Sequence, residues 1–357
     1  MKLIAILFGV LALVFSSTAA AHQPIVIKFS HVVSTDSPKG RAAEKFAELA
    51  AQYTNGRVKV EVYPSSCLYQ DVEEFAALQA GWVQMLAPSL SKLSALGVRE
   101  FEVFDLPYIF PDRAAALRVM DGPIGQQLLK KLESRGIVGL AYWDNGFKQM
   151  SANRPLVSAQ AQIGPGSGDS GSPESGAHPP GVTTRDFNGL KMRVQPGSKV
   201  LFAQMRALGA TPMPLPFSEV YSDLKQRAVD GTENPMSNFY SQRFFRVQKH
   251  LTISDHGYLG YAVIANRKFW DGLPADARSA LERAMQEATA YERELAPTEN
   301  EAALAAVREA ATTEIHVLTP EERSAWQEAL QPVHRQFEKR IGGELLRSVY
   351  EVVGSAK

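Results

Sequence analysis

The chain contains a single cysteine, Cys67, in 357 residues, so it cannot form an internal disulfide and packing must stabilise the fold. It also lacks a long apolar run: residues 3–15 are uncharged and apolar, but a membrane span needs roughly 18 to 20 such residues. Charge of one sign is not in excess, because 38 basic residues balance 38 acidic ones. This balance gives no reason to expect nucleic acid or an anionic membrane surface as a partner.

Sequence patterns that mark catalytic or metal sites are absent as well. The seven histidines are scattered without H-x-x-x-H spacing, and one cysteine cannot build a zinc cluster. Neither a P-loop nor a nucleophile elbow occurs. Glycines with G-x-G-x-x-G spacing occur at residues 166–171, but no strand pattern leads into them and no helix pattern follows. The sequence therefore predicts a protein that is not an enzyme and needs no metal ion or cofactor.

The N-terminal residues have the features of a secretory signal. Lys2 precedes the apolar stretch, and residues 19–21 are three alanines that form a small-residue cleavage site before His22. We therefore expect residues 1–21 to be removed and the mature chain to be exported, with a bacterial periplasm as its compartment. No cysteine stands at the cleavage point, so a lipid anchor is not expected.

Apolar strand patterns alternate with helical spacing in an order that occurs twice, which predicts two βαβαβ units. The first unit is expected to comprise strands at residues 25–32, 58–63 and 83–87 with helices at residues 40–53 and 72–80. The second is expected to comprise strands at residues 190–194, 211–215 and 229–235 with helices at residues 199–208 and 218–228. Their closing segments, LQAGWVQMLAP and LKQRAVDGTENP, are alike. An α/β fold follows, with two lobes that each have a mostly parallel sheet and a cleft at the carboxyl ends of the strands.

The last third of the chain has the pattern of bracing elements. Residues 261–266 read as a strand that crosses between the lobes, and residues 274–311 as a long helical stretch interrupted at Pro297. A further helix is expected to begin with Thr319 as N-cap and Glu322 as its capping-box partner, and to end near Ile341.

One segment does not fit the α/β pattern. Residues 163–181 consist mainly of glycine, serine and proline and have almost no side chains that could bury a core. We expect a disordered insertion between the lobes' elements.

Five segments together resemble the solute-binding proteins of TRAP transporters, and in particular their C4-dicarboxylate-binding, DctP-type branch. They are WDNGFKQM at residues 143–150, GLKMRV at 189–194, VDGTENP at 229–235, FDLPYIF at 104–110 and DHGYLGY at 255–261. The resemblance covers nearly all of the mature chain, in order. The glycine-rich insertion and Cys67 depart from the family pattern, but neither falls within one of these segments.

The resemblance implies a periplasmic-binding-protein-like fold and a receptor that hands a small carboxylate to the membrane subunits of a TRAP transporter. A C4-dicarboxylate such as malate, succinate or fumarate is the expected ligand. By resemblance, Arg193 pairs with a ligand carboxylate, Lys148 contributes to the anion site and Asn234 hydrogen-bonds the same end of the ligand. The facing lobe contributes the turns around His31 and Ser89.

The chemistry of the residues supports this assignment. A buried guanidinium offers two parallel donors to a carboxylate, a geometry that lysine cannot copy. Phe217 and Tyr240 are expected to form apolar walls of the ligand site.

The first lobe should comprise residues 22–145 and about 259–298, and the second lobe should comprise residues 146–258 and about 299–325. C-terminal helices over about residues 319–357 should brace both lobes.

Each of these assignments has an alternative. Lys148 could be a solvated surface charge, Asn234 a turn former before a proline, His31 a core residue and Arg193 the partner of an acid in its own lobe. The ligand could be another organic acid, such as a 2-oxo acid, a sugar acid or an aromatic acid. The ligand-loaded protein could also be the partner of a sensor kinase or chemoreceptor. A third possibility is that the chain is an exported enzyme.

Overall fold

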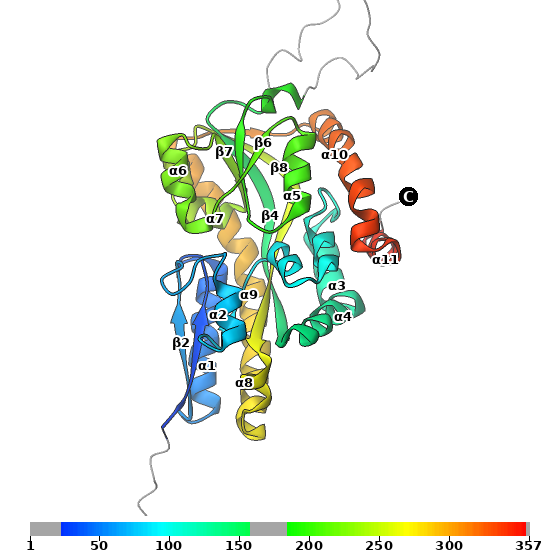
Figure 1. Ribbon diagram of the computed structural model, residues 1–357. Helices are drawn as coiled ribbons and strands as arrows, with labels where there is room; N and C mark the ends of the chain where they lie inside the picture. Colours follow the sequence, from blue (N-terminus) through cyan, green and yellow to red (C-terminus); the bar gives the residue numbers. More distant parts are fainter. Residues whose placement is uncertain (1–22, 158–183, 355–357) are drawn as a thin grey trace, which may run out of the picture.

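The computed structural model describes residues 23–157 and 184–354, so the expected signal peptide at residues 1–21 and the insertion at residues 163–181 lie outside the described residues. Within the described part, the chain forms one nine-stranded sheet flanked by helices, with strand order β2-β1-β3-β8-β4-β7-β5-β6 and β9 paired to β8. Figure 1 shows an elongated molecule with β2, α1 and α2 toward one end and β6, β7 and α6 toward the other.

The two predicted βαβαβ units are present. The first unit consists of β1 (Ile25–Ser30), α1 (Pro38–Tyr53), β2 (Val58–Tyr63), α2 (Glu74–Ala80) and β3 (Met85–Leu86), and β1 pairs in parallel with both β2 and β3. The second unit consists of β5 (Lys191–Val194), α5 (Lys199–Ala207), β6 (Thr211–Pro214), α6 (Val220–Gln226) and β7 (Gly231–Asn234), and β5 pairs in parallel with both β6 and β7. The internal repeat in the sequence is therefore a repeat in the structure.

Two long antiparallel strands, β4 (Ile137–Ala152) and β8 (His250–Asn266), join the units into one sheet. β8 pairs with β3 of the first unit, and β4 pairs with β7 of the second. The expected separate sheets are thus continuous, and the strand expected at residues 261–266 is only the end of a 17-residue strand. The sequence pattern did not predict β4. Its buried polar side chains and three register shifts disrupt the alternation of apolar and polar residues that marks a strand.

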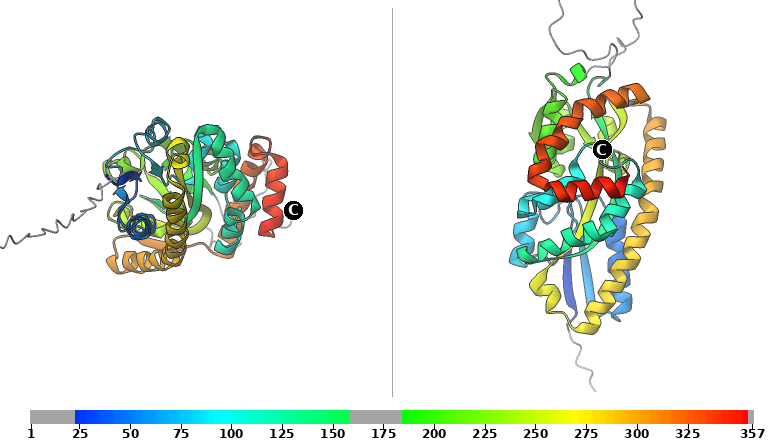
Figure 2. Two further views of the ribbon diagram at one scale, coloured as in Figure 1. Left: turned by 90° about the horizontal axis from the view of Figure 1, so that it is seen from below. Right: turned by 90° about the vertical axis from the view of Figure 1, so that its right-hand side faces the viewer.

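The helix α9 (Ala275–Ala310) runs along most of the molecule's length (Figure 2). The prediction that Pro297 interrupts this helix is wrong, because the helix continues through it. A proline removes the amide that would bond the carbonyl of Arg293, and that carbonyl instead accepts a hydrogen bond from the guanidinium of Arg113 at 2.6 Å. The side chain of Arg113 thus satisfies the group that Pro297 leaves open.

The C-terminal helices α10 (Pro320–Ile341) and α11 (Gly343–Val353) pack across one side of the molecule (Figure 2). The predicted capping box of Thr319 and Glu322 is present, and α10 ends at Ile341 as expected. Helix α10 contacts α5 of the second unit, and α11 contacts α3. Trp326, on α10, is fully buried in the largest apolar cluster.

Shorter elements complete the described chain. The remaining helices and strand are α3 (Arg113–Asp121), α4 (Pro123–Lys131), α7 (Met236–Ser241), α8 (Arg267–Asp271) and β9 (Glu314–Val317). The 3-10 helices are η1 (Leu90–Leu96), η2 (Arg99–Asp105), η3 (Leu132–Arg135), η5 (Thr184–Phe187), η6 (Phe217–Glu219) and η7 (Phe244–Arg246). None of the helices in the described ranges combines the length and apolar character required to cross a membrane.

Candidate ligand-binding cavity

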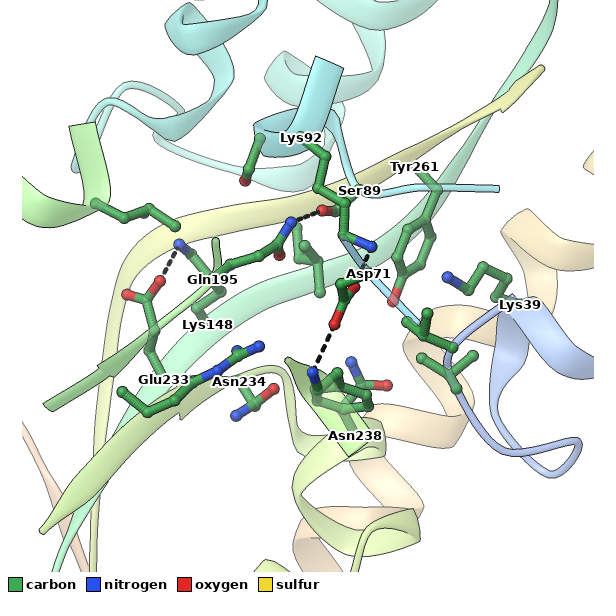
Figure 3. A pocket seen from close by; sticks show the side chains of 17 residues that line it. Lys39, Asp71, Ser89, Lys92, Lys148, Gln195, Glu233, Asn234, Asn238 and Tyr261 are labelled. Carbon is green, nitrogen blue, oxygen red and sulfur yellow. Dashed lines mark hydrogen bonds and ion pairs between the residues drawn. The ribbon is translucent and has the colours of Figure 1, made fainter. Parts of the chain in front are cut away.

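A cavity lies between the first and second units, where strands of both units end. It contains about 500 Å³ of space between protein atoms, including its open mouth. Residues that follow β1 and β3, and residues at the ends of β5 and β7, contribute to its wall, as expected for the carboxyl ends of parallel strands. Six charged side chains line the cavity: Lys39, Asp71, Lys92, Lys148, Arg193 and Glu233 (Figure 3).

Arg193 lies on β5 and is only 4% exposed. Its Nε donates to the carbonyl of Leu215 at 3.0 Å, and its guanidinium carbon lies 5.7 Å from the centroid of the Phe217 ring. Among the described residues, no carboxylate lies within 4.0 Å of the guanidinium, which argues against an ion pair within its own lobe. Burial lowers the pKa of this guanidinium, and the more distant charges of Asp71 and Glu233 only partly oppose that shift. Arg193 is thus a buried cation for which the described part of the chain offers no anionic partner at contact distance.

Lys148 lies on β4 and is buried, so it is not a solvated surface charge. Its Nζ lies 2.7 Å from Oε1 of Glu233. The other oxygen of Glu233 is 2.7 Å from Nε2 of His256 and accepts a hydrogen bond from Gln204 at 2.8 Å. Burial alone would raise the pKa of Glu233, but Lys148 and His256 together hold it far below its ordinary value. Lys148 therefore already has a carboxylate partner.

Ser89 and Asn234 line the cavity from opposite units. The hydroxyl of Ser89 accepts a short hydrogen bond from the side-chain amide of Gln195, so this pair connects the two units across the cavity. The amide nitrogen of Asn234 donates to the hydroxyl of Thr232 at 3.2 Å. Asn234 is buried next to Glu233 at the end of β7, and it retains its carbonyl and a second amide proton as hydrogen-bonding groups.

A second connection between the units runs through Asp71, which precedes α2. Its Oδ2 accepts a hydrogen bond from the backbone amide of Phe217 at 2.5 Å. Its other oxygen forms a short ion pair with Lys92, which also lies 2.7 Å from a carboxylate oxygen of Glu74. Lys92 is thus neutralised by two buried carboxylates of the first unit.

The structure brings five of the seven predicted site residues to the cavity: Arg193, Lys148, Asn234, Ser89 and Phe217. His31 is buried and is not among the residues that line the cavity, and its ring packs edge-on against Phe29 at a centroid distance of 6.4 Å. Burial, and next the charge of Lys39, lower its pKa to about 3, so its ring is neutral at physiological pH.

Tyr240 is not among the residues that line the cavity, and 42% of it is exposed. It stacks on Phe245 with a centroid distance of 5.4 Å. The helix α7 explains this placement, because Asn238 lines the cavity and a residue two positions later projects about 200° around the helix axis.

Sequence reasoning missed Lys39, Lys92 and Asp71 as cavity residues. A signal for Lys39 was present, because it shares the buried stripe of α1 with Ala42, Ala43 and Phe46. A lysine on the apolar face of a helix at the carboxyl end of a strand indicates a buried functional charge. Among the described residues, no group of three or more histidine, cysteine, aspartate or glutamate side chains could hold a metal ion.

Comparison with known protein families identifies one that covers most of the described chain. Residues 29–160 and 175–340 match the family model for the bacterial extracellular solute-binding proteins of family 7, also called DctP. The match skips residues 161–174, a segment that overlaps the expected insertion at residues 163–181. A similar protein is the C4-dicarboxylate-binding periplasmic protein DctP of Rhodobacter capsulatus, which is 55% identical over 98% of this chain and 97% of its own length.

Solved structures of this kind share the fold. A TRAP periplasmic solute-binding protein from Shewanella oneidensis with bound succinate has a TM-score of 0.84 and 39% sequence identity, covering 93% of this chain and all of that one. One from Pseudomonas aeruginosa with bound L-malate has a TM-score of 0.78 and 38% identity, covering 88% of this chain and all of that one. Both bind small dicarboxylates.

Proposed function

Because the chain belongs to family 7 of the bacterial extracellular solute-binding proteins, we propose that it binds a C4-dicarboxylate such as succinate, malate or fumarate in the cavity between its two units. The observation that carries this proposal is the buried guanidinium of Arg193, which lines the cavity without a carboxylate within 4.0 Å among the described residues. A ligand carboxylate supplies the missing partner through two parallel hydrogen bonds. Asn234 donates to the same carboxylate, and the ring of Phe217 packs beside the guanidinium, with its centroid 5.7 Å from the guanidinium carbon.

The balance of charge around the cavity supports an anionic ligand. Four cationic side chains and two carboxylates line it, and the buried carboxylate of Glu74 also pairs with Lys92, which leaves an excess of one positive charge. Binding a charged ligand in a desolvated site is favourable only when the charges are paired, and an anionic ligand pairs with this excess. The relatives with bound succinate and L-malate are consistent with this ligand class.

The protein closes around its ligand as two lobes, one built on each unit and joined by β4 and β8. We assign residues 22–145 and about 259–298 to the first lobe and residues 146–258 and about 299–325 to the second. The helices from about residue 319 onwards brace both lobes. The hydrogen bonds from Gln195 to Ser89 and from Phe217 to Asp71 connect the lobes at the cavity and favour the closed arrangement.

The loaded protein then delivers its ligand to the membrane subunits of a TRAP transporter. Residues 1–21 direct export and are removed, so the mature protein begins near His22 in the periplasm. N-terminal sequencing of periplasmic protein checks this step, and retention of residues 1–21 would contradict it. Capture of membrane partners with the loaded protein separates a transporter from a sensor kinase.

The ligand itself is identified by mass spectrometry of small molecules released from purified, denatured protein. We expect succinate, malate or fumarate. Thermal melting of ligand-free protein with a panel of acids provides the control, because a ligand that binds the native state raises the melting temperature. A shift with sugar acids, 2-oxo acids or aromatic acids, but none with C4-dicarboxylates, would reassign the ligand class.

A further inference from the structure

The four cations that line the cavity differ in whether they have a partner. Lys92 is paired with Asp71 and Glu74, and Lys148 is paired with Glu233. In the described part of the chain, Lys39 and Arg193 have no carboxylate within 4.0 Å. The cavity therefore presents two unpaired buried cations, which is the number that a dicarboxylate needs.

Lys39 occupies an unusual environment for an ammonium group. It lies in the first turn of α1, is 1% exposed, and donates one hydrogen bond at 2.8 Å to the carbonyl of Ala87. Its Nζ stands 3.8 Å from the centroid of the Tyr261 ring, which attracts it electrostatically. An ammonium group has three protons to donate, and this carbonyl accepts only one. The remaining donors can be satisfied by a ligand in the cavity that Lys39 lines.

We propose that Lys39 binds the second carboxylate of the ligand and is the residue that selects dicarboxylates over monocarboxylates. This inference rests on the proposed function and deepens it. Lys39 belongs to the first unit and Arg193 to the second, so a ligand with two carboxylates links the units by its two ends. In Figure 3, Lys39 lies beside Tyr261 on the opposite side of Asp71 from the pair of Lys148 and Glu233.

The other candidates for the second carboxylate are less suitable. Lys148 and Arg193 lie on β4 and β5, which both pair with β7, and the charge of Lys148 is already neutralised by Glu233 at 2.7 Å. If Lys148 bound the ligand instead, the buried carboxylate of Glu233 would lose part of the opposite charge that offsets its burial. The hydroxyl of Ser89 is engaged with Gln195 and carries no charge. Lys39 can pair with the ligand carboxylate as an ammonium group without disrupting an existing ion pair.

The acid–base behaviour of Lys39 provides a second readout. Burial, and next the charge of Lys92, lower the pKa of its ammonium to about 7 in the ligand-free protein. The charged and titratable groups that face it from neighbouring elements are those of His31, Asp71, Glu74, Lys92, Tyr261 and Glu292. A ligand carboxylate raises this pKa again, because it favours the charged form. Above pH 7, binding should therefore take up a proton, and at pH 5.5 the uptake at Lys39 should vanish.

The test compares succinate with succinamate, which has the same shape but carries a neutral amide in place of one carboxylate. Calorimetric titration of the mature protein should show that wild type binds succinate far more tightly. In Lys39→Met the affinity for succinate should fall on the order of 100-fold, whereas that for succinamate should change by less than about 3-fold. Lys45→Met is the matched control, because Lys45 lies on the same helix and pairs with Glu48 at the surface.

Two results with Lys39→Met would overturn the inference: wild-type affinity for succinate, or equal loss of both ligands, which would indicate a purely structural role. If this variant does not fold, titration of wild type at pH 8 in buffers of different ionisation enthalpy decides the matter, and absence of proton uptake would be the contrary result. Failure of the proposed function looks different, because wild type itself would then bind no C4-dicarboxylate.

Discussion

At the scale of single residues, the cavity is distinguished by how its buried charges are partnered. Each of Glu233, Lys148 and Lys92 has at least one opposite charge at contact distance, so none of them is an uncompensated buried charge in the ligand-free protein. Within residues 23–157 and 184–354, Arg193 and Lys39 contact backbone carbonyls and aromatic rings but no carboxylate within 4.0 Å. Burying a cation in this way costs free energy that folding alone does not recover, which is the expected signature of a binding group.

Substitution of Arg193 should separate binding from folding. In Arg193→Ala and Arg193→Lys, affinity for succinate should fall by about 100-fold or more, because a bidentate charged pair is lost. Because Arg193 has no carboxylate within 4.0 Å among the described residues, its removal leaves no buried carboxylate without a partner. The ligand-free protein should therefore stay folded. Calorimetric titration and thermal melting measure the two effects, with Arg206→Ala on the exposed face of α5 as control. Near wild-type affinity in both variants would move the anion site elsewhere.

Lys148 should behave differently, because its removal leaves Glu233 buried. Lys148→Met should lower the free energy of unfolding by about 3 kcal/mol, and Lys148→Met with Glu233→Gln should recover most of that loss. Urea denaturation at neutral pH measures both. If the single and double variants were equally destabilised, the pair would not be the source of the effect.

The same pair predicts a pH dependence. The pKa of Glu233 is lowered in the folded protein, so its contribution to stability is fully present above its unfolded pKa of about 4.3 and is lost as pH falls below that value. Urea denaturation between pH 6 and pH 3.5 should show a steeper loss of stability in wild type than in Glu233→Gln. Parallel pH profiles would contradict this assignment.

At the scale of elements, the sequence predicted what depends on local pattern. The two βαβαβ units have clear apolar alternation, and the capping box at Thr319 has a specific spacing, so both were found. The strand β4 was missed because its polar residues are buried by contacts with β8, β7 and α9, which no local pattern reveals. Lys39 was missed for a related reason: most helix lysines are exposed, and its partners come from distant segments.

Because α9 continues through Pro297, we expect the effects of substituting Pro297 and Arg113 on stability to be coupled. Pro297→Ala restores an amide that can bond the carbonyl of Arg293, which Arg113 otherwise satisfies. Arg113→Ala should therefore destabilise the Pro297→Ala protein less than it destabilises wild type, by about 1 kcal/mol. A double-mutant cycle by urea denaturation measures this coupling. Strict additivity would show that Arg113 acts only through its ion pair with Asp144.

At the scale of the whole molecule, the insertion should be dispensable. Residues 163–181 are rich in glycine, serine and proline, and the family match leaves residues 161–174 unpaired. Loop length contributes little to stability, about 0.6 kcal/mol per doubling. Deleting residues 164–180 should leave the melting temperature and ligand affinity nearly unchanged. A large loss of either would show that the segment packs against a lobe or the cavity.

The whole account depends on one dicarboxylate joining the two units through two unpaired cations. Calorimetric titration of ligand-free wild-type protein with succinate tests this claim most directly. The account predicts saturable binding of one succinate per chain, with much weaker binding of the C4 monocarboxylate butyrate. Absence of binding heat with succinate, malate and fumarate across several temperatures, or equal affinity for succinate and butyrate, would contradict it.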